Sequence, residues 1–169
     1  MTDLNSDFPT RTGSFKAAVR AGTTVTEYTR AGAGRPILLL LRKTAGDDSS
    51  SAQVLQAIAD RFRVIAPEQI PAAGEFATWL TSFLDGLGLA RASIVTEDEL
   101  GVPVFSYALL EPSRVDRLVV LSKAGLDTDP LDGSLAAPVP EGSHPLLIVR
   151  QDGPIEDVVA KVVGFLAAT

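Results

Sequence analysis

The chain has 169 residues and a net charge of −6, and 46% of its residues are hydrophobic, which fits one globular domain with one core. The acidic balance and the scattered lysines and arginines argue against a nucleic-acid or anionic-membrane surface, and the absence of cysteine excludes disulfides and a thiolate nucleophile. No apolar run reaches the ~18 residues of a membrane span, and the polar start does not resemble a secretory signal, so we expect a cytoplasmic protein.

The amino-terminal part predicts a polar arm followed by two strands. Residues 1–13 are polar and contain Pro9 and Gly13, so we expect a flexible arm ahead of a single domain over 14–169. Strands are predicted over 15–20 and 23–30, because the second run is rich in Thr, Val and Tyr. The following Ala31–Arg35 segment is a glycine-punctuated turn. It precedes a strand and therefore lacks the helix amino-terminus that a phosphate cradle needs.

Five short apolar runs follow, each too short for a helix and each flanked by turn residues. Strands that are buried on both faces of a sheet have this pattern. The predicted buried strands are 37–41, 62–66, 92–95, 118–121 and 146–149.

Helical patterns lie between these strands. The first has an apolar stripe of Leu55, Ile58, Ala59 and Phe62, with Ser49 to Ser51 offered as N-caps. The second covers 76–87, where Trp79 fits the core-facing stripe and Gly88 can end the helix. Residues 100–110 are apolar nearly all round, which predicts a buried helix. The last covers 155–166, with Pro154, Glu156 and Asp157 suited to its start.

Alternation of strands and helices predicts an α/β fold of three layers, with a mostly parallel sheet and helices on both faces. The exception is residues 122–143, which are rich in Gly, Pro, Asp and Ser. We expect a long loop there.

The amino-acid sequences of five segments, and their order along the chain, resemble the α/β-hydrolase family. The resemblance covers about residues 14–122 in register and 145–168 after a deletion, and it implies that the 122–143 loop stands in place of the family's cap domain. The segments that carry it are Gly22–Gly32, Pro36–Leu41, Arg61–Pro67, Trp79–Leu89 and Glu111–Ser122.

The family's nucleophile is the serine at the centre of G-x-S-x-G, on a strained turn between strand and helix. Thr96-Glu-Asp-Glu-Leu100 stands there in this chain, so Asp98 takes the place of the serine and both glycines are replaced. The resemblance implies a degenerate catalytic triad.

The family's other catalytic groups are also altered. Leu41-Arg42 replaces the His-Gly of the oxyanion loop, and Asp152 lies near the place of the acid. The family's last strand and the histidine after it have no counterpart. The only histidine, His144, precedes the 146–149 strand, so we expect it at the other edge of the sheet from the site.

We therefore expect a pseudoenzyme that is not a Ser-His-Asp hydrolase, takes no cofactor or metal, and acts as a binding or protein-interaction module. Loss of the cap and last strand should expose apolar surface and a sheet edge, which favours a homodimer or another stable protein partner. A small molecule could occupy the vestigial pocket, where we expect Arg42, Glu97, Asp98 and Glu99 to line the site. A small ligand-carrying protein is a further possibility.

Two enzymatic or metal-binding alternatives remain. Asp98 could work with Asp152 or Glu97 as acid and base on an ester, lactone or halide. The more ordinary interpretation is that Glu97 to Glu99 cap the following helix. Carboxylates after strand ends could instead hold Mg²⁺ or Ca²⁺, and nearby Arg42, Lys43 and Arg150 could neutralise them or hold an anion. The carboxylates are Asp47, Asp48, Glu68, Glu97, Asp98 and Asp152.

Overall fold

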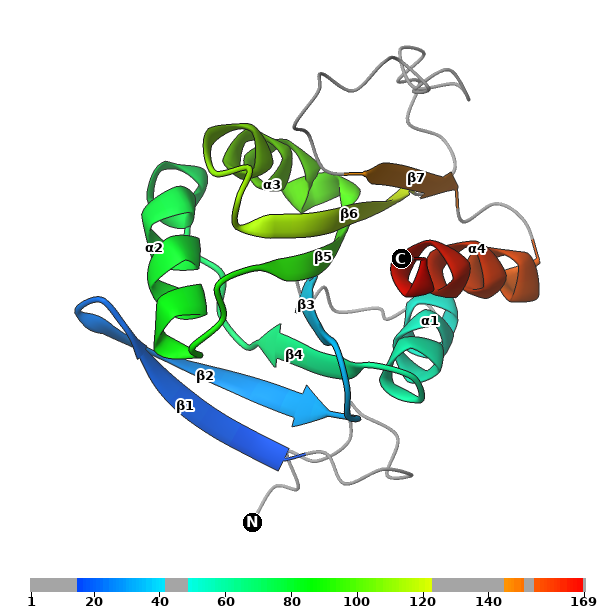
Figure 1. Ribbon diagram of the computed structural model, residues 1–169, viewed down its shortest axis with the longest axis horizontal. Coiled ribbons are helices and arrows are strands. Elements are labelled where there is room, and N and C mark those ends of the chain that lie inside the picture. The colour runs from blue at the N-terminus through cyan, green and yellow to red at the C-terminus, as the bar shows by residue number, and fades with distance from the viewer. Residues whose placement is uncertain (1–14, 42–48, 123–144, 151–153, 169) are drawn as a thin grey trace.

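The computed structural model describes residues 15–41, 49–122, 145–150 and 154–168 (Figure 1). The predicted arm over 1–13 and the predicted loop over 122–143, apart from Ser122 itself, lie outside these residues. Within the described part of the chain, no helix is long and apolar enough to cross a membrane.

A single sheet of seven strands organises the described chain, in the order β1-β2-β4-β3-β5-β6-β7. The first two pairings, β1 with β2 and β2 with β4, are antiparallel, and the remaining pairs are parallel. The predicted mostly parallel sheet is therefore confirmed. The strands are β1 (Phe15–Ala21), β2 (Thr24–Ala31), β3 (Pro36–Leu40), β4 (Arg63–Pro67), β5 (Ala92–Glu97), β6 (Val115–Ser122) and β7 (Leu146–Arg150).

Helices cover both faces of the sheet, which confirms the three-layer α/β architecture (Figure 1). Helices α2 (Ala73–Gly86) and α3 (Asp98–Leu110) pack on one face, and α1 (Ser49–Ala59) and α4 (Ile155–Ala167) pack on the other. Successive residues of the central strands serve the two cores alternately: Ile94 of β5 joins the α2 and α3 core, and Val95 joins the α1 and α4 core.

Helix α2 follows its predicted pattern closely. It ends with Gly88 at φ +71°, whose amide donates to Asp85 O, while the Leu89 amide donates to Leu84 O. This pair of bonds is a Schellman motif, for which glycine is suited because it adopts a positive φ without steric cost. Trp79 is a core residue as predicted, and its indole Nε1 donates to the Thr26 hydroxyl at 3.1 Å.

Arg114 joins α2 to the start of the parallel strands. Its guanidinium donates to Ala90 O at 3.0 Å and forms an ion pair with Asp85. Burial of the side chain lowers the pKa of Arg114, but hydrogen bonds and charge interactions with Tyr107 and Asp85 outweigh burial, so its pKa is raised. The guanidinium thus stays charged while it holds the α2 and α3 layer on the sheet.

The predicted N-caps of α1 are wrong. The helix begins at Ser49, so Ser50 and Ser51 lie inside its first turn, and the N-cap position falls on residue 48, outside the described residues. Phe62 is buried as expected but follows the helix, because the chain has already turned toward β4. The side chain of Leu55 lies outside the description.

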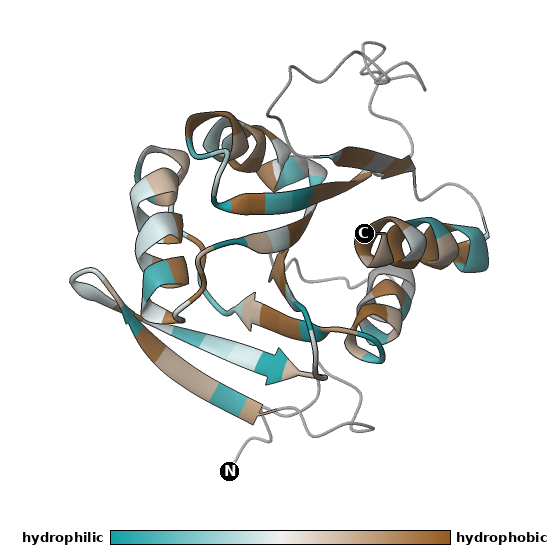
Figure 2. Ribbon diagram, viewed as in Figure 1, coloured by the Kyte–Doolittle hydropathy of each residue, from teal (hydrophilic) through white to brown (hydrophobic). Residues whose placement is uncertain are grey.

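The prediction of a buried helix over 100–110 is also wrong. One face of α3 is buried, whereas the opposite face exposes Val102 by 77%, Phe105 by 44%, Leu109 by 59% and Leu110 by 71%. Figure 2 shows hydrophobic colouring continuing along α3. These four apolar side chains remain exposed among the residues that the structure describes. The buried face consists of Leu100, Val104, Tyr107 and Ala108.

Candidate functional site

The end of β5 meets the start of α3 at the position that the sequence singles out. Strand β5 lies between β3 and β6, and α3 begins at Asp98 directly after β5 ends at Glu97. Thr96 is fully buried, and its hydroxyl donates to Leu40 O of the neighbouring strand at 2.9 Å. Leu100 is 2% exposed and packs into the α2 and α3 core. The side chains of Thr96 and Leu100 therefore fill the space between helix and sheet.

The backbone passes from strand to helix through ordinary conformations. Glu97 is extended, with φ −107° and ψ 169°, and among the described residues only glycines have a positive φ. The described turn therefore contains no residue in the left-handed conformation. The capping prediction is wrong for Glu97, which occupies the N-cap position without a side-chain cap hydrogen bond.

The remaining predicted site residues are only partly described. Glu99 is exposed in the first turn of α3, and Asp98 is placed by its backbone alone, because its side chain lies outside the description. Arg150 ends β7, also without a described side chain. Of the predicted site residues, the structure therefore places together only Glu97, Asp98 and Glu99, which are consecutive in the sequence. The residues outside the description are Arg42, Lys43, Asp47, Asp48, His144 and Asp152.

Glu68, one of the carboxylates considered as metal ligands, lies elsewhere. Its carboxylate is 2.7 Å from the Lys16 ammonium, and its amide donates to Glu27 O of β2 at 2.8 Å. These contacts tie the end of β4 to the β1–β2 hairpin. No three His, Asp or Glu side chains come together as a metal site within the described ranges.

The only histidine of the sequence directly precedes Pro145, which lies at the opposite edge of the sheet from Glu97. Leu146 pairs with Leu118 of β6, whereas Glu97 pairs with Leu121, so Pro145 marks the amino end of the parallel strands.

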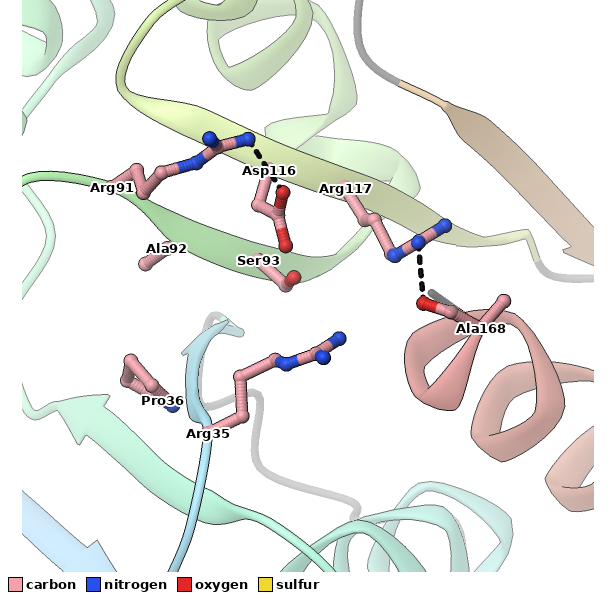
Figure 3. Close-up of a pocket in the computed structure, with 8 residues that line it drawn as sticks. All are labelled: Arg35, Pro36, Arg91, Ala92, Ser93, Asp116, Arg117 and Ala168. Carbon is pink, nitrogen blue, oxygen red and sulfur yellow. Dashed lines mark hydrogen bonds and ion pairs between the residues drawn. The ribbon is translucent and has the colours of Figure 1, made fainter.

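A pocket that the sequence did not predict opens at this amino edge. Its volume is about 420 Å³, and Figure 3 shows the guanidinium groups of Arg35, Arg91 and Arg117 around it. Arg35 and Arg91 directly precede β3 and β5, Arg117 is the third residue of β6, and these three strands are neighbours in the sheet. The three arginines near strand starts are visible in the sequence, but only the strand order shows that they lie close together.

No protein-family model matches the chain, and no curated protein matches it. Solved structures do. A serine hydrolase involved in carbazole degradation matches with a TM-score of 0.56 and 26% identity, over 69% of this chain and 51% of that one. The epoxide hydrolase CorEH matches with a TM-score of 0.54 and 24% identity, over 68% of this chain and 44% of that one. A haloalkane dehalogenase from Agrobacterium tumefaciens matches with a TM-score of 0.53 and 18% identity, over 64% of this chain and 41% of that one.

This chain thus spans about half or less of the length of these hydrolases. The likeness is one of fold: a mixed, mostly parallel sheet with helices. The chain has a reduced α/β-hydrolase fold.

Proposed function

We propose that this protein is a non-catalytic member of the α/β-hydrolase fold that acts as an interaction module and forms a homodimer. The observation that carries the first part is the closed strand-to-helix turn. Thr96 and Leu100 stand where the family has its two glycines, and both side chains are buried. The Thr96 hydroxyl also donates a hydrogen bond to Leu40 O at the end of β3. A nucleophile needs an exposed position at this turn.

Hydrolysis on this fold also needs a base within hydrogen-bond reach of the nucleophile. The sequence contains one histidine, and the residue that follows it, Pro145, is at the amino edge of the sheet. Triad groups act as a unit, so the loss of several of them leaves little chemistry.

The alternative is a hydrolase whose chemistry centres on Asp98, with Glu97 or Asp152 as acid or base and an ester, lactone or halide as substrate. The structural neighbours favour it, because they are hydrolases and include a dehalogenase and epoxide hydrolases. It requires that a carboxylate group activate water in place of histidine.

Hydrolysis assays on the full chain separate these two functions. With a nitrophenyl ester, a lactone and a haloalkane, we expect rates equal to those of buffer, unchanged in Asp98→Asn. The matched control is Asp157→Asn, an exposed acidic residue in the first turn of α4. Turnover that disappears in Asp98→Asn and persists in the control would establish the alternative.

The proposed dimer rests on the exposed face of α3. Val102, Phe105 and Leu109 lie three and four residues apart, so they form one stripe opposite the buried face. Between Leu100 and Leu110 the helix carries no charge. Because two copies each have a net charge of −6, an uncharged apolar face is where they can approach with least repulsion.

Sedimentation velocity tests the dimer. The native chain is expected to sediment as a dimer, and Phe105→Glu combined with Leu109→Glu as a folded monomer, because the new charges would lose hydration at the interface. Val25→Glu, which places a charge at a 59% exposed valine on β2, should leave the dimer intact. A native monomer at high concentration, or a dimer that survives both α3 charges, would contradict the proposal.

A further inference from the structure

The pocket at the amino edge of the sheet is built by segments far apart in the sequence. Arg35 and Pro36 come from the start of β3, Arg91, Ala92 and Ser93 from the start of β5, and Asp116 and Arg117 from β6. Ala168 closes the pocket just after α4 (Figure 3). The pocket is independent of the turn at Asp98, which lies at the other edge.

Positive charge dominates this pocket in an otherwise acidic chain. Three guanidinium groups face one carboxylate, and that carboxylate, Asp116, is already paired with Arg91 at 2.6 Å. The other two arginines donate to carbonyls at the end of α4. Arg35 reaches Leu166 O at 3.2 Å, and Arg117 reaches Ala168 O at 2.5 Å. These bonds satisfy the negative end of the helix and fix both guanidinium groups in place.

Two buried polar atoms in the pocket lack a hydrogen-bond partner. Ser93 is 1% exposed, yet its hydroxyl makes no hydrogen bond, and neither does Nε of Arg117. In Figure 3 the Ser93 hydroxyl points into the space between Arg35 and Arg117. A buried polar group without a partner costs stability, so a ligand that accepts from it gains that hydrogen bond.

We propose that this pocket binds a phosphate oxyanion, either free phosphate or the phosphate group of a small phosphomonoester. Each arginine presents five N–H donors, so a guanidinium with one nitrogen bonded to a carbonyl retains others for the ligand. Arginine matches phosphate through paired donors, and the Ser93 hydroxyl adds a neutral one. Asp116 does not oppose the ligand, because Arg91 neutralises it. The volume leaves room for a small organic group beside the phosphate.

Isothermal titration of the full chain tests the site, with inorganic phosphate, glycerol 3-phosphate and glycerol as probes in chloride of matched ionic strength. We expect saturable binding of both phosphates and none of glycerol. Arg117→Gln and Arg35→Gln should each weaken binding by about tenfold or more, as loss of a hydrogen bond between charged groups does. Arg20→Gln removes an exposed arginine on β1, outside the pocket, and should change affinity by less than about twofold.

Ser93→Ala separates a direct loss of binding from a loss caused by misfolding. Its midpoint of thermal unfolding without ligand should not fall, because the hydroxyl has no partner to lose, while phosphate affinity should fall about three- to tenfold. Tighter binding of glycerol 3-phosphate would identify a phosphomonoester, and equal binding would identify free phosphate; both support the site. Heats that match those of chloride alone, or affinity unchanged in Ser93→Ala and Arg117→Gln, would overturn it.

Discussion

Replacing Gly32 with alanine is expected to remove most of the folded protein. Gly32 has φ +74°, and a Cβ there would lie 2.1 Å from Phe62 O and 2.3 Å from Ala59 O. Both obstacles are backbone carbonyls in the turn between α1 and β4, so relief requires moving the helix or the strand. We expect a loss of more than about 4 kcal/mol, which is most of the stability of an ordinary domain.

Two other glycines give matched controls for this substitution in chemical denaturation. Gly34→Ala also forces alanine to a positive φ, but the nearest atom to its Cβ is 3.7 Å away, so only backbone strain of about 1–2 kcal/mol remains. Gly164→Ala meets nothing within 4 Å inside α4 and should stabilise the protein by about 0.5–1 kcal/mol. A Gly32→Ala protein as stable as Gly34→Ala would show that the turn accommodates a side chain.

The sheet could be predicted because its physical causes are local. Strands buried on both faces are expected to be apolar at consecutive positions, and residues 37–41 show that pattern without ambiguity. The end of α2 could also be predicted, because Gly88 is suited to the left-handed position that its Schellman motif requires. These features depend on neighbours a few residues away along the chain.

The error in α3 has the opposite origin. An apolar helix predicts burial on all sides only if enough neighbouring elements exist to surround it, and that number is a property of the whole fold. Here the described chain covers one face, with Tyr107 1% exposed, and leaves the face with Val102 open. Composition could not distinguish a helix buried on all sides from one that leaves an apolar face exposed.

The two edges of the sheet show how much of the site could be predicted. At the carboxyl edge, the sequence predicted the turn from strand to helix, but not the hydrogen bond from the Thr96 hydroxyl to Leu40 O. At the amino edge, Arg35 and Arg117 are 82 positions apart and meet only because β3, β5 and β6 are adjacent. At the carboxyl edge the described turn buries Thr96 and Leu100, whereas the amino edge holds an open, positively charged pocket.

Replacing Phe83 with alanine is expected to have the second largest effect on stability. Phe83 is fully buried in the α2 and α3 core, stacked on Trp79 at 5.2 Å and edge-on to Tyr28 at 5.9 Å. Truncation removes both ring contacts and leaves a cavity that the sheet cannot close, so we expect a loss of about 3–5 kcal/mol.

Urea denaturation over a series of protein concentrations measures this loss, with variants compared at equal concentration, because a dimer makes apparent stability depend on concentration. Phe83→Leu keeps most of the volume and should cost less than half as much, about 1.5 kcal/mol. Phe105→Ala is the matched control on α3: its ring is 44% exposed, so its removal should change the stability of the folded monomer by about 1 kcal/mol or less. If Phe105→Ala cost as much as Phe83→Ala at every protein concentration, the exposed face of α3 would be part of the monomer's own core and the proposed dimer surface would be lost.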